Sequence, residues 1–272
     1  MKTAFFSLVV ATAILPSLAR AQTADEIIAK NLAARGGIEK MRAIRTIAIT
    51  GKLTAPDGGG GPLLVRLMRP DRIREEVTFG PAKSVRSFDG ESAWVLDEDK
   101  TGAEARPLTG ADLANLRDEG ANGIDGALAD YATKGNAVTF AGAAVIDGKT
   151  CYKLKVELRS GHILTQYIDS QTFLEIYEEL VRNDGDNETV IDETVGDYRS
   201  EGGILFAHTF VSGVQGHPER FTLTIEKIEL NPAFDASLFR MPKGKVSNNA
   251  IPQSVPAPDA LPGKKLRAAS NA

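Results

Sequence analysis

Short runs of alternating apolar and polar positions dominate the chain between residues 46 and 230, which is the pattern of strands with one buried face. In the first run, Ile47, Ile49 and Leu53 alternate with polar or small residues. The alternation predicts strands at 46–53, 63–69, 72–79, 83–88, 91–96, 138–146, 151–158, 163–168, 173–182, 189–198, 204–211 and 221–230. Turn pairs such as Asp89-Gly90 and Asp147-Gly148 separate many of them.

Helical periodicity is confined to two regions. Thr23 and Glu26 have the spacing of a capping box, and Gly36-Gly37 predicts the end of the helix that Thr23 begins. A second short helix is expected at 38–44, and a helical insertion at 109–131. The element order predicts a mainly β protein: a single curved antiparallel sheet or half-open barrel of about 11 strands, with a few covering helices.

The two ends of the chain differ from this pattern. Residues 1–21 combine Lys2, an apolar stretch and Ala19-Arg20-Ala21, which predicts a cleaved signal peptide. The alternative is a membrane anchor, but an apolar run of about fifteen residues interrupted by Pro16 is short for a span. We expect one domain at 22–242 and a disordered tail at 243–272, where Pro, Ala, Asn and Ser predominate.

The charge and the cysteine content limit which partners and which anchors the protein can have. The signal segment holds two basic residues and no acidic ones, so the formal net charge of −4 becomes −6 without it. An acidic chain without a basic stripe argues against nucleic acid as a partner. Cys151 is the single cysteine, so the domain has no intramolecular disulfide, and Gln22 occupies the place where a lipoprotein would carry its lipidated cysteine. We expect a periplasmic monomer without a lipid anchor.

Motifs of enzyme chemistry are missing from the sequence. Gly148-Lys149-Thr150 ends like a phosphate loop, but Ala143 stands where the first glycine is needed. His162, His208 and His217 lack the spacing of metal ligands, and there is no G-x-S-x-G elbow. The sequence therefore predicts a non-enzymatic protein with no catalytic residues, no metal and no cofactor.

Apolar strand positions remain as the candidate binding surface. Fourteen of them could point to one concave face: Ile47, Ile49, Leu67, Val77, Phe79, Trp94, Leu96, Leu154, Val156, Tyr167, Phe206, Phe210, Phe221 and Ile225. They could equally form an ordinary core, although a sheet of this size often leaves room for a ligand.

Three segments carry a resemblance to a known family. Arg69-Pro70-Asp71-Arg72, followed by Phe88-Asp89-Gly90 with Trp94 four residues after the glycine, resembles the R-P-N … D-G-x-x-x-W pattern of LolA/LolB-type lipoprotein carriers. The segment 231–242, ending Phe239-Arg240-Met241-Pro242, is similar to the end of that family's chain. The start of the chain, with its helix and Gly-Gly, is similar to the outer membrane lipoprotein-sorting branch.

The resemblance implies a periplasmic carrier whose concave sheet accepts acyl chains of a lipoprotein or another amphiphile, in sorting to the outer membrane. By position, Arg69 matches the arginine that holds the family's helical lid closed. The candidate ligand contacts are Arg69, Trp94, Leu67, Val77, Phe79, Leu96, Phe206 and Phe210. The alternative is an envelope sensor or interaction module that uses the same fold to bind a protein partner.

Overall fold

The computed structural model describes residues 22–80, 82–97, 104–184 and 187–243. The signal peptide expected at 1–21 and nearly all of the tail expected at 243–272 lie outside these ranges. The described helices are α1 (Ala24–Ala34), α2 (Ile38–Ala43), α3 (Gly110–Asn122) and the short 3-10 helix η1 (Ala236–Phe239). The strands are β1 (Thr46–Thr54), β2 (Gly60–Met68), β3 (Arg72–Phe79), β4 (Ala82–Phe88), β5 (Ala93–Asp97), β6 (Arg106–Leu108), β7 (Ala137–Ile146), β8 (Lys149–Glu157), β9 (Ile163–Asp169), β10 (Glu175–Asp184), β11 (Asn187–Glu201), β12 (Ile204–Val214) and β13 (Phe221–Leu230).

All thirteen strands form one antiparallel sheet in the order β6-β5-β4-β3-β2-β1-β13-β12-β11-β10-β9-β8-β7. The mainly β, curved-sheet prediction is confirmed. The strand that the sequence did not predict is β6, which has only three residues and contains Pro107. Such a short edge strand has too few residues to show alternation.

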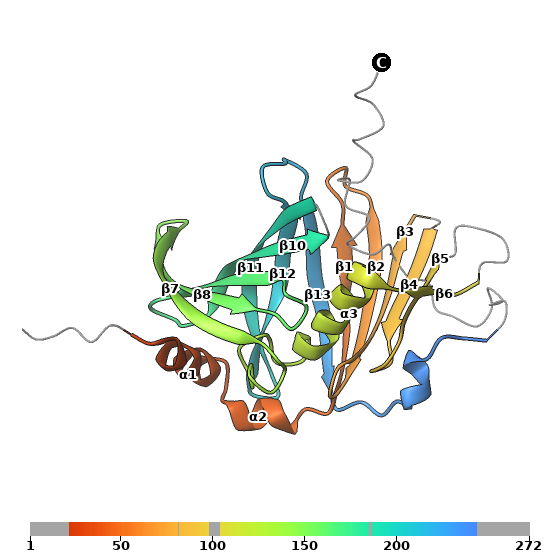
Figure 1. Ribbon diagram of the computed structural model, residues 1–272, viewed down its shortest axis with the longest axis horizontal. Helices are drawn as coiled ribbons and strands as arrows, with labels where there is room; N and C mark the ends of the chain where they lie inside the picture. Colours follow the sequence, from red (N-terminus) through yellow and green to blue (C-terminus); the bar gives the residue numbers. More distant parts are fainter. Residues whose placement is uncertain (1–21, 81, 98–103, 185–186, 244–272) are drawn as a thin grey trace, which may run out of the picture.

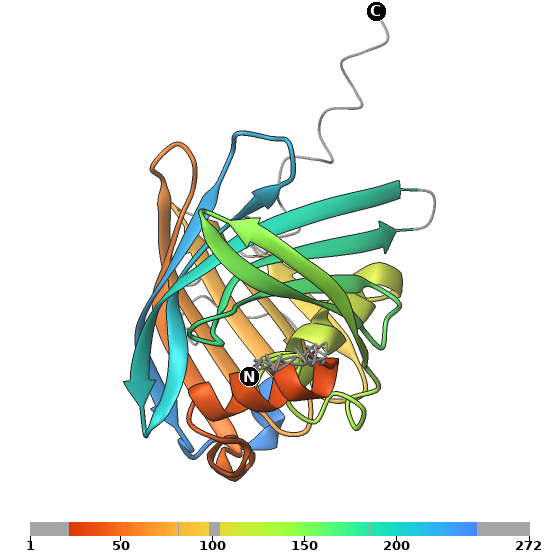
Figure 2. The same ribbon diagram turned by 90° about the vertical axis from the view of Figure 1, so that its left-hand side faces the viewer.

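The topology explains why helices cover the open side. The first six strands run from the centre of the sheet to one edge, and the last seven run from the other edge back to the centre, where β1 pairs with β13. The chain must therefore cross from β6 to β7, and it does so through α3 and residues 123–136. Figures 1 and 2 show α3 inside the curve of the sheet and α1 across its mouth.

Bulges give the sheet part of its curvature. The β1–β13 register shifts between Thr50 and Gly51, where a Cβ on Gly51 would lie 2.4 Å from the carbonyl oxygen of Thr224. The backbones approach this closely only because residue 51 is a glycine. A second bulge in β7, between Phe140 and Ala143, bends the other end of the sheet.

Two apolar clusters lie inside the curve. One packs Met41 of α2 and Leu116 of α3 against β1–β5, β12 and β13. The other packs Ile27 and Ile28 of α1 together with Ala127 and Leu128 against β8 and β9. Each half of the sheet thus has its own core beneath its own helix.

The C-terminal segment packs on the opposite face of the sheet. Trp94 donates its indole N–H to the carbonyl oxygen of Phe239 at 2.8 Å, and Ser87 Oγ donates to the same oxygen at 3.0 Å. Val85 and Leu96 complete a small cluster with Trp94. The Phe239-Arg240-Met241-Pro242 run is therefore fixed to the outside of the β3–β5 meander.

Candidate functional site

A cavity of about 160 Å³ lies between the two cores. Its walls come from α1, from the segment after α3, and from β1, β9, β10, β11, β12 and β13: Asn31, Arg35, Ile49, Gly123, Ile124, Gly126, Ala127, Leu128, Gln166, Glu175, Val195, Tyr198, Phe206, Ala207, Phe210, Ile225 and Ile228. Phe206 and Phe210 are only half-buried, so the inner face is not packed to completion. A cavity of roughly 150 Å³ can hold benzene, so an acyl chain needs more room than the closed molecule offers.

Six of the eight predicted contact residues fall into three groups. Phe206 and Phe210 line the cavity. Leu67 and Val77 are buried in the core beneath α2 and α3, and Phe79 packs against that core. Arg69 lies at the end of β2, beneath the segment after α3.

Trp94, Leu96 and Tyr167 are placed away from the cavity. Side chains alternate along a strand, and Ala93 and Gln166 face inward, so their neighbours Trp94 and Tyr167 face outward. Trp94 and Leu96 share the outer cluster beneath the C-terminal segment. The concave-face interpretation of these three residues is corrected: they help to build the outside of the sheet.

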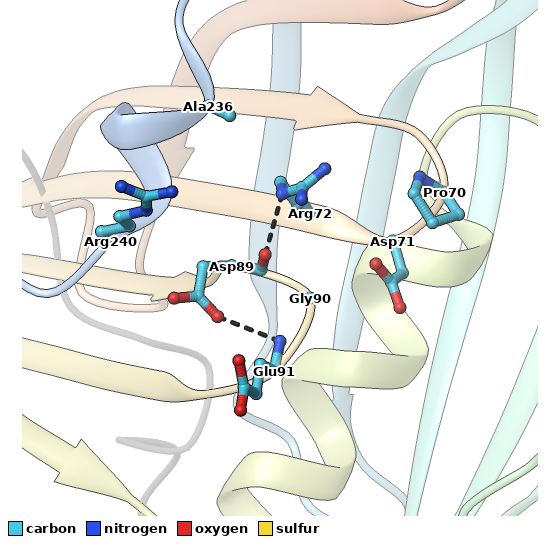
Figure 3. A pocket seen from close by; sticks show the side chains of 8 residues that line it. All are labelled: Pro70, Asp71, Arg72, Asp89, Gly90, Glu91, Ala236 and Arg240. Atoms are coloured by element: carbon cyan, nitrogen blue, oxygen red, sulfur yellow. Dashed lines mark hydrogen bonds between the residues drawn. The ribbon is translucent and has the colours of Figure 1, made fainter.

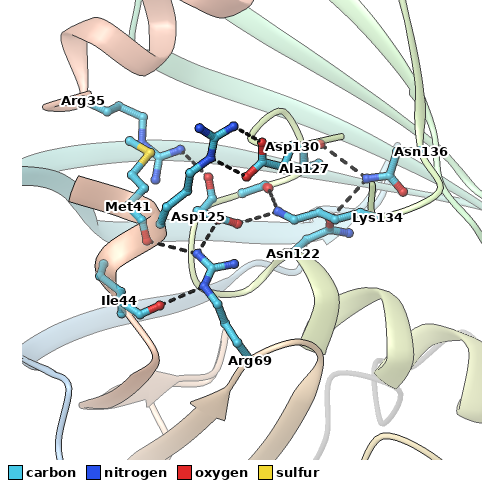
Figure 4. Close-up of polar contacts among 12 residues, drawn as sticks. Arg35, Met41, Ile44, Arg69, Asn122, Asp125, Ala127, Asp130, Lys134 and Asn136 are labelled. Carbon is cyan, nitrogen blue, oxygen red and sulfur yellow. Dashed lines mark hydrogen bonds and ion pairs between the residues drawn. The ribbon is translucent and has the colours of Figure 1, made fainter. Parts of the chain in front are cut away.

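Arg69 makes polar contacts with Ile44, Met41 and Asp125, and we call this group of contacts the latch (Figure 4). Its Nε donates to the carbonyl oxygen of Ile44 at 2.8 Å, and its Nη2 donates to that of Met41 at 3.0 Å and to Asp125 Oδ2 at 2.6 Å. One arginine thus joins the end of β2 to α2 and to the segment after α3.

Asp125 is the centre of this latch and was not predicted. It is fully buried, and its carboxylate pairs with Lys134 as well as Arg69. Its carbonyl oxygen accepts from Arg35 Nη1 at 3.0 Å, which adds α1 to the network. Desolvation lowers the pKa of Lys134, although Asp125 favours its charged form. The only signal in the sequence was a carboxylate between apolar residues in the region 124–131.

A second latch lies on the surface nearby. Asp130 accepts from Arg42 Nη2 at 2.7 Å and from its Nε at 3.1 Å, and the hydrogen bond from Arg42 lowers the pKa of Asp130. Asn136 donates to Asn122 and to the carbonyl oxygen of Ala127. The segment 123–136 is therefore tied to α2 and folded onto itself.

Helix α3 is held by both halves of the sheet. Glu119 accepts from Arg86 of β4 at 2.8 Å, and Arg182 of β10 lies 3.7 Å from its other oxygen. Asp118 accepts from Ser160, and Asn115 contacts His162 Nε2 at 2.8 Å, in the β8–β9 turn. Opening the mouth would have to break some of these contacts.

A row of polar side chains crosses the inner face beside the cavity. Gln166, Glu178, Glu193 and Ser212 are directly paired across β9, β10, β11 and β12. Desolvation raises the pKa of Glu175 and Glu178, and the pKa of Glu193 to about 8, with the charge of Glu178 adding to the shift of Glu193. We call Glu175, Glu178 and Glu193 the inner carboxylates.

A larger pocket of about 400 Å³ lies at a junction of turns (Figure 3). Its charged groups make hydrogen bonds at the turns themselves. Arg72 Nε donates to the carbonyl oxygen of Asp89 at 2.8 Å, and the Asp89 side chain accepts from the backbone N–H of Glu91 at 3.0 Å. Burial raises the pKa of Asp71 on the pocket's wall. The pocket joins the β2–β3 and β4–β5 turns to η1.

The described residues lack two features of other protein classes. In the described ranges, no group of three or more His, Cys, Asp or Glu residues is arranged to hold a metal ion. None of the helices described here has the length and apolar character required to cross a membrane.

Known structures share this fold. A LolA superfamily protein from Nitrosomonas europaea aligns with 81% of this chain and 98% of its own at 13% identity, with a TM-score of 0.53. An outer membrane lipoprotein-sorting protein domain from Vibrio parahaemolyticus aligns with 79% of this chain and 94% of its own at 11% identity, with a TM-score of 0.51. No family model matches the sequence, and no curated protein matches it. The chain therefore has a LolA-like fold.

Proposed function

From this LolA-like fold, we propose that the protein is an exported, non-enzymatic carrier that binds acyl chains on its concave face in the periplasm. The cargo that we infer is the lipid moiety of lipoproteins bound for the outer membrane, or another amphiphile. The observation that carries the proposal is an incompletely filled cavity, lined by Phe206 and Phe210, beneath a segment closed by polar contacts.

The energies of binding and release are compatible with a protein that binds an acyl chain reversibly. Each buried CH₂ contributes roughly 0.8 kcal/mol, so an acyl chain supplies ample binding energy before the costs of association. Release is then the harder step. Hydrogen bonds and ion pairs across the closed mouth would help release, because water can replace these contacts once the segment after α3 moves away.

Uptake of the uncharged probe N-phenyl-1-naphthylamine tests the proposal. We expect a saturable increase in probe fluorescence. Lipid extracted from the periplasm of cells that produce the protein should compete with the probe and reduce this increase. Native mass spectrometry of protein purified from the periplasm should show bound lipid. A protein that neither takes up the probe nor carries lipid is not an acyl carrier, and an interaction module would then be the better interpretation.

Val195→Phe distinguishes a binding cavity from a core. Val195 lines the cavity, so a larger side chain should fill it and lower probe affinity at least about tenfold with little loss of stability. In a fully packed core, the same change costs about 1–3 kcal/mol. Val145→Phe is the control, because Val145 is 69% exposed. Equal probe uptake by both variants would place the binding site elsewhere.

A further inference from the structure

The inner carboxylates lie close together on the concave face, beside the apolar residues of the cavity. Glu178 of β10 lies directly opposite Glu193 of β11. Like charges paired in this way repel each other. Glu175 joins them through Gln166, whose Nε2 donates to Glu175 Oε1 at 2.7 Å. The three side chains are half-buried, so they lie deep in the curve and still meet solvent.

Compensating positive charge is scarce. Within the described part of the chain, none of the three glutamates makes an ion pair with Lys, Arg or His. Arg35 stabilises the charged form of Glu175, but its Nη1 is committed to the carbonyl oxygen of Asp125. Arg182 lies further along β10 and pairs with Glu119. The fold therefore gathers three carboxylates, and Arg35 favours the charged form of Glu175 but of neither Glu178 nor Glu193.

Gln166 gives a second, independent indication of a missing ligand. Its side chain is 5% exposed and lines the cavity next to Glu175. Its Oε1 is buried and has no hydrogen-bond partner, on the same amide group whose Nε2 donates to Glu175. A buried acceptor without a partner is unfavourable, so a donor from a ligand would be stabilising there.

Apolar rows flank this polar row on both sides. Leu164, Leu180 and Ile191 are paired across β9–β11 two residues along on one side. Val195 and Phe210 are paired on the other side, where they line the cavity. A ligand that fits must therefore combine a chain for the apolar rows with a donor-rich head for the acceptors between them.

We propose that this site selects amphiphiles with a cationic amine head group, seated among Glu175, Glu178, Glu193 and Gln166 Oε1. A primary ammonium offers three N–H donors and one positive charge, which matches the acceptors and the charge that this row lacks. The inference rests on the proposed carrier function and specifies its ligand class. A lysine-bearing protein is the weaker fit, because the flanking rows call for a hydrocarbon chain.

Three probes with the same chain and different heads test the proposal. We expect the full chain to bind dodecylamine at least tenfold more tightly than dodecanoic acid or dodecanol at pH 7, measured by displacement of N-phenyl-1-naphthylamine. If none of the three binds, the carrier function itself has failed. If all three bind equally, or the acid binds most tightly, the carrier function stands and the amine preference is overturned.

Isosteric variants locate the effect. Glu178→Gln and Glu193→Gln should each weaken dodecylamine binding at least tenfold and change dodecanol binding less than twofold. Neither variant removes packing volume or adds a charge, so both should fold. Glu157→Gln is the control, because Glu157 is exposed on β8. An unchanged preference for the amine in both inner variants would overturn the proposed seat.

Two further ligands separate the alternatives. Lysine amide, which carries the cation without the chain, should bind at least a hundredfold more weakly than dodecylamine. Comparable binding would indicate a lysine-bearing protein partner and contradict the amphiphile. Calcium chloride should not displace dodecylamine at millimolar concentration. Displacement that tracks bound calcium would make the row a metal site.

Proton release gives an independent readout. Because the pKa of Glu193 is raised to about 8, its carboxyl holds a proton at pH 7, and a bound ammonium should displace it. Calorimetry in phosphate and Tris buffers should show release of about one proton per dodecylamine. Arg35 and Tyr198 line the cavity with Glu175, and burial raises the pKa of the Tyr198 phenol, so this group keeps its proton near pH 7. Absence of proton release would contradict a head group seated at Glu193.

Discussion

At the residue scale, Asp125 joins the segment after α3 to the end of β2, and two cations share its buried carboxylate. Arg69 and Lys134 both lie in protected positions, so removing the anion leaves positive charge without compensation. Breaking a buried pair costs about 3–5 kcal/mol, whereas an exposed pair contributes up to about 1 kcal/mol. The two latches should therefore differ greatly in their importance.

We expect Asp125→Ala to lower the free energy of unfolding by about 3 kcal/mol in urea titration. Arg42→Ala should lower it by less than about 1 kcal/mol, because its pair with Asp130 is at the surface. Equal losses in the two variants would show that Asp125 is no more important than a solvated carboxylate.

Glu193 makes stability depend on pH. Its pKa of about 8 in the folded protein lies above the ordinary 4.5, so between these values the folded state binds more protons than the unfolded state. Stability should be complete below pH 4.5 with respect to this group, and should fall as the pH rises through 8. We expect a loss of about 3 kcal/mol between pH 5.5 and pH 9.

Glu193→Gln should remove most of that loss when urea unfolding is compared at the two pH values. Glu157→Gln, an exposed change elsewhere, should retain it. A steep decline in both variants would assign the pH dependence to other groups, such as Glu175.

Only some residues of this site could be predicted from the sequence. Arg69 was found because a short motif carries it, but its partner Asp125 lies 56 residues away, and periodicity gives no information on such long-range pairs. Trp94 was assigned to the wrong face for a different reason. Ala93, Trp94, Val95 and Leu96 are all buried, so the strand shows no alternation that would reveal which side is concave.

At the element scale, α3 packs closely on the meander because glycine replaces a side chain at the contact. A Cβ on Gly120 would lie 2.0 Å from the carbonyl oxygen of Asp71 and 3.2 Å from a methyl carbon of Ile73. The carbonyl belongs to the backbone of the β2–β3 turn, so it cannot move aside easily. The helix itself tolerates alanine well, which makes the expected cost purely one of docking.

Gly120→Ala should therefore lower the free energy of unfolding by about 2 kcal/mol and increase hydrogen exchange in α3 more than in β8–β10. Gly196→Ala is the matched control, because its Cβ would meet open space. A stabilising effect of Gly120→Ala would mean that α3 is not docked on Asp71 in solution.

Strands were the most predictable elements, because alternation is a local property. The missing strand, β6, was too short to show it, and the positions of the bulges in β1 and β7 depend on partners that are distant in sequence. The helical insertion at 109–131 was also predicted, but its place inside the curve follows from the crossing between the two edges of the sheet.

At the scale of the whole molecule, the two cores make two half-sheets that meet at β1 and β13, with the cavity between them. Glu119 of α3 touches both halves, through Arg86 and Arg182. A cavity of about 160 Å³ is too small for an acyl chain, so the proposed function requires the mouth to open before binding. The rate of binding should then report on opening.

In stopped-flow mixing with dodecylamine, the observed rate should level off at high ligand concentration, because opening becomes the slow step. Glu119→Gln should raise that plateau several-fold, since it weakens the ties of α3 to both halves while leaving the cavity walls intact. Glu157→Gln should leave it unchanged. A rate that rises linearly with ligand, and is equal in all three proteins, would show that the cavity is reached without any movement of α3.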